Sequence, residues 1–553
     1  MERKLSVVVP CQNAAPWVEE LLEALVAQGI ADCEILVVDN GSTDETPELV
    51  EACARADPRI RLLRSAASSA GAARNEGTAA ARGEYLVFAD SDDLVPDGAY
   101  GAMLESLERS GSDMAIGDHL KFSPTATWSP TERWRAFDEA REAAAPEDVP
   151  AVLTGRACWN RMFRRSFWER IGLRFPEIAS LEDIEPMTRA FVGATSVDVV
   201  QATVYLYRDR TDGASISQAV DAAAMLRYLQ QEQACARLLH DRPALLEQYV
   251  RMVLDADGWS HLSRFLASRP SGAEVSSVAA ALADFAAVVP LDTRHDVAPA
   301  RRLLWDLVLL GEWDAAERFI VATNDGDAEE RLGAWRLALS ALSDGNFERR
   351  RIASLVDDGL LPTLVNHADA VPMRWLREAL SDLQVLPSDG GDPGLRSAMA
   401  DAVRRGDASS AAAVSALRHI VPLVVSSAVP TTAGLTVSGP FRTRGNGFEL
   451  QLALRSESAI VTLPIATNTE TWSAVIDAER LAVGRWTVSV LASGVDEEFP
   501  VVTARMPLPP ISEPFTIQPL ADRKDAWRFV VDRRRSGKAR IASLLSRVGR
   551  RFR

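Results

Sequence analysis

Residues 85–93 read YLVFADSDD and carry the strongest structural signal in the chain. The first five residues form a short apolar run, typical of a β-strand that is buried on both faces. Three carboxylates follow at once, from Asp90, Asp92 and Asp93. Ligands of open α/β sheets bind at the carboxyl ends of the strands, so these carboxylates are expected at a binding edge. They repel one another unless a positive charge lies among them, and a hard divalent cation with diphosphate oxygens would supply it. Taken alone, the motif is also typical of a cap on the following helix.

Strand and helix patterns alternate around this stretch from the N-terminus to about residue 120. Strands are expected at 5–9, 34–38, 60–63 and 85–89, and helices at 16–28, 44–56 and 71–82. This alternation predicts βαβ units and a parallel sheet. Residues 124–150 are polar and rich in Pro, Ala and Glu, which indicates a flexible excursion.

Three more motifs lie at the ends of these expected elements. Residues 9–13 (VPCQN) close the first strand, and residues 37–44 (VVDNGSTD) close the second. Residues 71–77 (GAARNEG) open a helix, where backbone amides and Arg74 suit a diphosphate. Each motif alone also fits an ordinary turn or helix, but all of them in this order are far less expected by chance.

Together these motifs resemble family 2 glycosyltransferases of the GT-A fold. Three later stretches agree with that family: CWNRMFR at 158–164, LED at 181–183, and YLYR at 205–208 followed by SIS at 215–217. The resemblance covers roughly residues 4–217. Arg161 stands where the family usually has Lys, which keeps the positive charge.

The resemblance implies a role for each matching residue. On the donor side, the nucleotide and its sugar would be contacted by Pro10, Asp39, Arg74, Asp90, Ser91 and Asp92. Arg74 would face the base or the diphosphate, and Asp92, with Asp90, would hold Mn²⁺ or Mg²⁺. On the acceptor side, Asp183 would be the catalytic base, and Glu182, Trp159 and Asn160 would help to place the acceptor.

The activity implied is a metal-dependent, inverting transfer of a sugar from a nucleotide diphosphate sugar to a hydroxyl. The donor is expected to be a UDP-sugar, with GDP- and dTDP-sugars as alternatives. The acceptor is expected to be a cell-envelope polysaccharide, a teichoic acid or a lipid-linked glycan. The chemistry needs one carboxylate to take the hydroxyl proton and a cation to stabilise the departing diphosphate. An inactive glycan-binding or scaffold protein and a nucleotidyltransferase remain as rival interpretations.

The rest of the chain predicts accessory regions after the catalytic domain at 1–217. Residues 218–418 show helical periodicity, and residues 419–506 have short alternating runs typical of a small antiparallel β-sandwich. Residues 507–553 are expected to be a Pro-rich linker and a basic tail. The β region is a candidate for self-association or polymer binding, because its short strands leave edges that need protection.

Charge and composition bound the remaining possibilities. The 553-residue chain has a net charge of −16 and a hydrophobic fraction of 47%, which favours a folded protein and argues against nucleic-acid binding. Residues 522–553 carry twelve Lys or Arg and only three Asp, and on a helix residues 541–552 would form an apolar stripe. Such a tail could bind an anionic membrane surface. With no signal peptide or spanning segment in the sequence and five scattered cysteines, we expect a cytoplasmic protein, peripheral at the inner face of the membrane.

Overall fold

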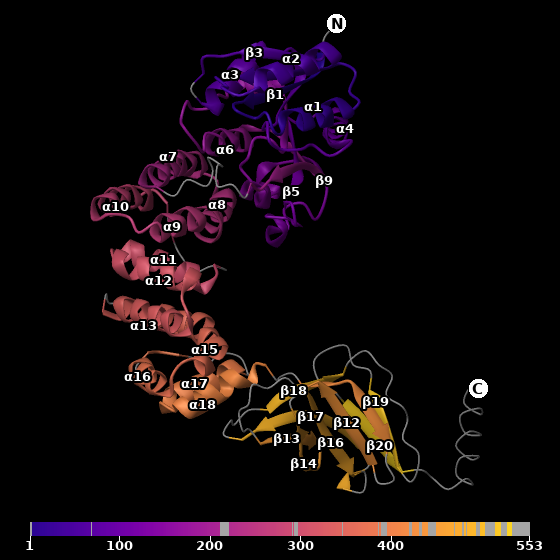
Figure 1. Cartoon of the computed structure of the whole chain (residues 1–553), viewed down its shortest axis with the longest axis vertical. Coiled ribbons are helices and arrows are strands. Elements are labelled where there is room, and N and C mark those ends of the chain that lie inside the picture. The colour runs from indigo at the N-terminus through magenta and orange to yellow at the C-terminus, as the bar shows by residue number, and fades with distance from the viewer. Residues whose placement is uncertain are drawn as a thin grey trace, which may run out of the picture. The chain divides into compact units, whose positions relative to one another are not determined.

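The computed structural model describes two compact units, Met1–Trp313 and Asp314–Arg553 (Figure 1). Within residues 3–533 the description omits 68, 211–220, 290, 292–296, 345–346, 385, 389–394, 420–422, 431–433, 441–448, 469, 478–479, 483, 494–497, 504–514 and 521–527. The predicted tail stripe at 541–552 therefore lies outside the described residues.

A nine-stranded mixed sheet forms the centre of the first unit, with strand order β3-β2-β1-β4-β8-β5-β9-β7 and β6 paired to β5. The strands are β1 (Arg3–Cys11), β2 (Cys33–Asp39), β3 (Ile60–Arg64), β4 (Gly83–Phe88), β5 (Met114–Ser123), β6 (Ala126–Trp128), β7 (Arg141–Ala144), β8 (Arg161–Arg164) and β9 (Val197–Arg208). The pairs β1–β2, β2–β3 and β1–β4 are parallel. All four strands expected in the first 120 residues are confirmed.

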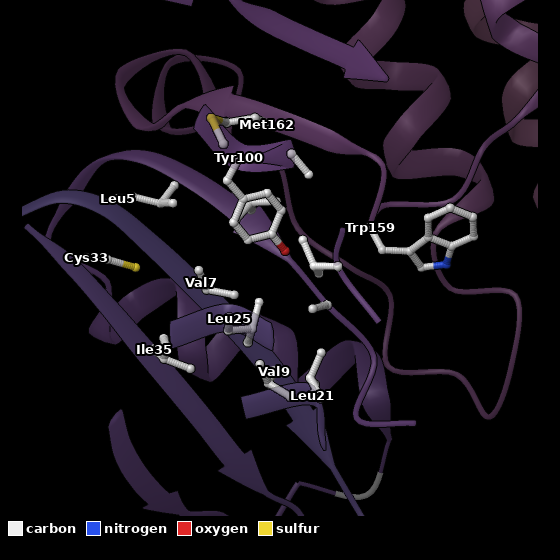
Figure 2. Packing of buried hydrophobic residues seen from close by; sticks show 14 of the residues in the cluster. Leu5, Val7, Val9, Leu21, Leu25, Cys33, Ile35, Tyr100, Trp159 and Met162 are labelled. Carbon is white, nitrogen blue, oxygen red and sulfur yellow. The ribbon is translucent and has the colours of Figure 1, made fainter. Parts of the chain in front are cut away.

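Helices cover both faces of this sheet. They are α1 (Val18–Ala27), α2 (Thr46–Ala56), α3 (Ala70–Ala80), α4 (Ala99–Ser110), α5 (Arg165–Arg170) and α6 (Ile184–Gly193). On one face, the side chains of Leu21 and Leu25 join Val7 and Val9 of β1 in a single buried cluster (Figure 2). On the other face, α3 lies so close to β1 that a Cβ at Gly77 would come within 2.4 Å of a Val8 methyl group.

The parallel sheet expected from the first 120 residues is confirmed for β1 to β4. Later in the chain β8 joins the same sheet and runs antiparallel to both β4 and β5. The chain reaches β8 without a crossover helix, so no right-handed βαβ connection fixes its direction. One expectation is wrong: the segment at 124–150 is not simply an excursion, since β7 within it pairs with β9.

The acidic motif is not a helix cap. The next helix, α4, starts at Ala99, and its N-cap is Gly98 in the left-handed conformation (φ 75°). The side chains of Asp90, Asp92 and Asp93 are therefore left for other partners.

The described part of the first unit also contains the helices α7 (Ala222–Leu239), α8 (Pro243–Asp255), α9 (Asp257–Ala267), α10 (Gly272–Ala286) and α11 (Pro299–Leu310). A buried ion pair ties them to the sheet. Arg156, in the loop before β8, donates to both carboxylate oxygens of Glu232 on α7, at 2.8 and 2.6 Å. The compact unit therefore continues past the predicted domain boundary at residue 217.

The second unit contains helices followed by strands, as expected. The helices after α12 (Trp313–Asp325) are α13 (Ala328–Asp344), α14 (Arg349–Leu355), α15 (Leu361–His367), α16 (Met373–Leu383), α17 (Leu395–Arg405) and α18 (Ala408–Leu417). None of the helices in the described part of the chain is both long and apolar enough to cross a membrane.

The strands of the second unit form two sheets. One has the order β10-β18-β17-β13-β14, extended by β20 and β19, and the other has the order β11-β12-β16-β15. Their bounds are β10 (Leu423–Val425), β11 (Ser427–Pro430), β12 (Gly434–Pro440), β13 (Leu450–Arg455), β14 (Ile460–Pro464), β15 (Ala466–Thr467), β16 (Thr471–Asp477), β17 (Gly484–Ala492), β18 (Glu498–Thr503), β19 (Phe515–Leu520) and β20 (Arg528–Arg533). Residues 507–553 are thus not only linker and tail, because β20 pairs with β17.

Candidate active site

Three sequence motifs meet at the carboxyl edge of the sheet, because β1 lies between β2 and β4. Pro10 pairs in register with Val38, and Cys11 pairs with Asp39 at the end of β2. Asp90 follows β4, the other neighbour of β1. The predicted donor residues Pro10, Asp39 and Asp90 therefore share one edge.

Asp39 holds the turn that follows β2. Its carboxylate accepts a hydrogen bond from the backbone N–H of Ser42 at 3.1 Å and lies 3.4 Å from a guanidinium nitrogen of Arg64. The same turn is tied to the end of β1, since the Asn13 side chain accepts from the backbone N–H of Thr43 at 2.8 Å. The loops that follow β1 and β2 thus form one structure.

Arg74 connects the acidic motif with the Glu182-Asp183 motif. One guanidinium nitrogen lies 2.6 Å from Asp90 Oδ1, and the other lies 2.5 Å from Glu182 Oε1. The Arg74 residue is only 5% exposed. The arginine therefore joins two motifs that are about a hundred residues apart, and its expected contact with the donor stays a prediction.

Asp183 lies half-buried at the N-cap of α6, where its side chain makes no capping hydrogen bond. Burial, and then the charge of Glu182, raise the pKa of Asp183 to about 7, while Arg74 opposes the rise. Leu181, two residues earlier, has a φ of 65°, a conformation that is strained for a bulky side chain. A carboxyl group whose pKa lies near neutrality is suited to accept a proton.

The loop that carries Glu182 and Asp183 is fastened to α3 by Asn75. The Asn75 amide donates to the carbonyl of Phe175 at 2.8 Å, and its oxygen accepts from the Phe175 N–H at 3.0 Å. Gly71 on the same helix permits this approach, because a Cβ there would lie 2.5 Å from the carbonyl oxygen of Pro176. Asn75 stands within the quoted GAARNEG motif, but its role was not predicted.

Tyr205 links Asp90, a predicted donor residue, with Trp159, a predicted acceptor residue. Its hydroxyl accepts a hydrogen bond from the backbone N–H of Asp90 at 2.9 Å, and its ring stacks on Trp159 with centroids 4.3 Å apart. Asp93 supports the same strand end, because its carboxylate accepts from the backbone N–H of Arg208 at 2.7 Å. Burial, and then the charges of Asp92 and Asp90, raise the pKa of Asp93 well above its usual range. The YLYR motif was the only sequence signal for Tyr205.

Asn160 is buried, and both ends of its amide are engaged. Its nitrogen donates to the carbonyl of Gly117 at 2.8 Å, and its oxygen accepts from Arg161 at 2.7 Å. Burial lowers the pKa of Arg161 to about 10, and this side chain also donates to the carbonyls of Ala157 and Gly155. Asn160 and Arg161 thus shape the loop that presents Trp159, and contact with the acceptor stays a prediction for Trp159 and Asn160.

The central residues of the acidic motif lie at the same edge. Ser91 hydrogen-bonds the Cys11 thiol, whose pKa burial raises to about 12. Asp92 lies 3.2 Å from the Arg210 guanidinium. Within the described residues there is no group of three or more His, Cys, Asp or Glu side chains that could hold a metal ion.

The chain matches known proteins in this region. A family model described as "Glycosyl transferase family 2" matches residues 6–172. EpsJ of Bacillus subtilis, described as an uncharacterized glycosyltransferase, is 30% identical over 41% of this chain and 67% of its own length. The succinoglycan biosynthesis protein ExoO of Rhizobium meliloti is 30% identical over 40% of this chain and 68% of its own length. A crystal structure of residues 1–349 of S. aureus TarS in complex with UDP-GlcNAc is also similar, with a TM-score of 0.47 and 20% identity over 59% of this chain and 95% of that one.

The mixed sheet, its acidic edge and the motifs around that edge define a glycosyltransferase domain of the GT-A fold. The chain belongs to glycosyltransferase family 2.

Proposed function

We propose that the chain transfers a sugar, with inversion, from a nucleotide diphosphate sugar to a hydroxyl of a cell-envelope glycan. The observation that carries the proposal is the buried Arg74 link, which holds Glu182 and Asp183 beside the acidic motif. A UDP-sugar is the first donor to test. A polysaccharide acceptor is supported by the relative ExoO, which is described as a succinoglycan biosynthesis protein. Teichoic acid and lipid-linked glycan acceptors belong to the same proposal.

In the proposed step, Asp183 accepts the proton of the acceptor hydroxyl. The hydroxyl oxygen forms a bond to the anomeric carbon as the bond from that carbon to the donor diphosphate breaks, and the nucleoside diphosphate leaves with the bonding electrons. A pKa of about 7 leaves enough Asp183 ionised at neutral pH to act as the base. Glu182, Trp159 and Asn160 would position the acceptor, while Pro10, Asp39 and Ser91 would contact the donor.

The residues present fit a divalent cation. Asp92 and Asp90 offer hard oxygen ligands, and Mg²⁺ and Mn²⁺ bind well to one or two carboxylates together with substrate phosphates. Burial, and then the charge of Asp90, raise the pKa of Asp92, and the charge of Arg210 opposes part of the rise. When bound, the cation would stabilise the charge of the departing diphosphate.

The β region supports a proposal of self-association or polymer binding. Val429 and Val475 are each 55% exposed, and both pair with Thr436, so they lie in one row across β11, β12 and β16. Exposed apolar residues in register on one sheet face suit a contact surface. Sedimentation and polymer-binding measurements on a chain ending near residue 422 would show the loss of either property.

Membrane contact through residues 533–553 is a separate proposal. It is tested by comparing the binding of the chain to anionic and to neutral vesicles.

A thermal-shift screen tests the central proposal. UDP-, GDP- and dTDP-sugars are compared with and without Mn²⁺, since a ligand that binds only the folded state raises its stability. We expect one nucleotide class to stabilise the protein only with Mn²⁺, and Asp92→Ala to abolish that effect. Detection of sugar transfer or donor hydrolysis then separates this activity from nucleotidyl transfer, which would release pyrophosphate. A protein that binds no donor under any condition would support the scaffold interpretation.

A further inference from the structure

Two carboxylates of the acidic motif are each paired with an arginine, and the two arginines differ in their surroundings. Arg74, which pairs with Asp90, is 5% exposed and holds two ion pairs within the core of the site. Arg210, which pairs with Asp92, is half-buried and comes from the chain just beyond β9. Arg74 is therefore a fixed part of the fold, whereas Arg210 approaches the site from its rim.

The end of β9 places Arg210 beside Asp92. Arg208 donates from its side chain to the backbone carbonyl of Asp92 at 2.7 Å and to Glu20 at 2.8 Å, which anchors the strand end over the motif. Two residues later, the Arg210 guanidinium lies 4.9 Å from the ring centre of Trp17, and its Nε lies 3.2 Å from Asp92 Oδ2. A guanidinium over an indole ring is an attractive contact that holds the side chain at this position.

A guanidinium and a divalent cation compete for the carboxylate of Asp92. Asp90, Arg208 and Arg210 all act on the pKa of this carboxylate, and Asp93 lies next in the chain. Arg210 offsets part of the rise in the pKa of Asp92 that burial and Asp90 cause. Two positive groups a few ångströms apart repel each other, so a cation bound to Asp92 and the arginine in its present position disfavour each other.

We propose that Arg210 is the resident counter-charge of Asp92, which a divalent cation displaces, and that the released guanidinium then binds the donor diphosphate. The second half of this inference rests on the proposed function, because it assumes a nucleotide diphosphate donor. Arginine suits both states, since its planar fork pairs with carboxylates and with phosphates. In this scheme Asp92 has a positive partner at every stage.

The first test measures Mn²⁺ binding to the full chain without a donor, by electron paramagnetic resonance of free Mn²⁺ at pH 8. Removal of the competing charge in Arg210→Gln is expected to tighten Mn²⁺ binding about tenfold, the factor that one charge-assisted hydrogen bond contributes. Arg210→Lys should lie between this variant and the wild type. Adding Asp92→Asn to Arg210→Gln should remove the gain.

The matched control is Arg109→Gln, which also removes one positive charge. Arg109 is exposed on α4 and pairs with Glu142, away from the acidic motif. The Mn²⁺ affinity of the Arg109→Gln variant should equal that of the wild type. Equal or weaker Mn²⁺ binding by Arg210→Gln, or the same tightening in Arg109→Gln, would overturn the inference.

The second test measures UDP binding by calorimetry at saturating Mn²⁺. Arg210→Gln is expected to bind UDP about tenfold more weakly than the wild type, so that one substitution shifts the two affinities in opposite directions. A merely structural role would not produce opposite shifts. Unchanged or tighter UDP binding would overturn the transfer of Arg210 to the diphosphate. The Mn²⁺ titration involves neither donor nor turnover, so its failure is distinct from a failure of the proposed function.

Discussion

Asp183 has an environment that differs from that of an ordinary helix-capping aspartate. It stands at the N-cap of α6 without capping it, and burial and Glu182 raise its pKa to about 7. A helix cap gains from being ionised, so a raised pKa is a cost to the folded state. The cost is understandable if the carboxylate must take a proton during each reaction cycle.

This pKa predicts the pH dependence of catalysis. The base works only when Asp183 is ionised, so kcat/KM should fall as the pH drops below about 7, approaching tenfold per pH unit. The measurement is a profile from pH 5.5 to 8.5 at saturating Mn²⁺. The residual activity of Asp183→Asn should lack this step, and a wild-type profile that is flat over the range would contradict the assignment.

The carboxylates of the site and Arg74 were named from the sequence, but the ion pairs of Arg74 with Asp90 and of Arg210 with Asp92 were not predicted. Asp90, Asp92 and Asp183 stand in short motifs with recognisable chemistry. The positions of Arg74 and Arg210 depend on contacts between segments more than a hundred residues apart, which no local pattern encodes. For the same reason the sequence could not show that the ring of Tyr205 stacks on that of Trp159.

At the scale of elements, α3 carries most of the connections in the site. Gly71 and Gly77 let it approach the loop at 175–182 and β1, while Arg74 and Asn75 reach across to that loop. The helix itself was predictable from its pattern. The antiparallel β8 was not, because a four-residue strand has too few residues to reveal its direction.

Gly77→Ala tests the close packing of α3. A Cβ 2.4 Å from a methyl group of Val8 must displace buried atoms, so we expect a loss of about 1–3 kcal/mol in unfolding free energy. Gly101→Ala, in α4, is the matched control. Nothing lies within 4 Å of a Cβ at that position, and alanine should stabilise the helix by about 0.5–1 kcal/mol. Urea unfolding measures the change in unfolding free energy for each substitution. Equal changes for Gly77→Ala and Gly101→Ala would refute the packing argument.

Asn75→Ala tests the fastening of the loop that carries Glu182 and Asp183. Loss of both hydrogen bonds to Phe175 should let Glu182 and Asp183 drift, and small misplacements of catalytic groups are costly. We expect kcat to fall at least about tenfold while the affinity for the nucleotide donor changes little. Asn75→Asp keeps the acceptor for the Phe175 N–H and should recover part of the loss. A wild-type kcat for Asn75→Ala would remove this residue from the site.

At the scale of the whole molecule, the first unit is larger than the motif-bearing segment. Arg156, Glu232 and Tyr249 form a buried group that joins the loop before β8 to α7 and α8. The sequence motifs end near residue 217, and helical periodicity alone could not show to which unit the next helices belong. Because both charges are buried, the Arg156–Glu232 ion pair must stay intact for the first unit to be stable.

Truncation tests the extent of this unit. A chain ending at residue 313 should unfold cooperatively, whereas one ending at 217 should not, because it lacks α7 and α8, which bury Arg156 and supply its partner Glu232. Removing one member of a buried ion pair costs about 3–5 kcal/mol. In the full chain, Glu232→Gln should lower the Tm, and Glu247→Gln, an exposed acid on α8, should not. Cooperative unfolding of the 217-residue chain at the same Tm would contradict the extended unit.

The central claim is that the donor is bound at the acidic motif while Asp183 performs the proton transfer. The most direct measurement compares donor affinity and sugar-transfer rate in the wild type and in Asp183→Asn, with the donor found in the thermal-shift screen and with Mn²⁺. Glu185→Gln, which removes a neighbouring acid paired with Arg189, is the control and should behave like the wild type. We predict that Asp183→Asn binds the donor with nearly unchanged affinity and transfers sugar at least about a hundredfold more slowly. Transfer at the wild-type rate by a folded Asp183→Asn protein would contradict the account.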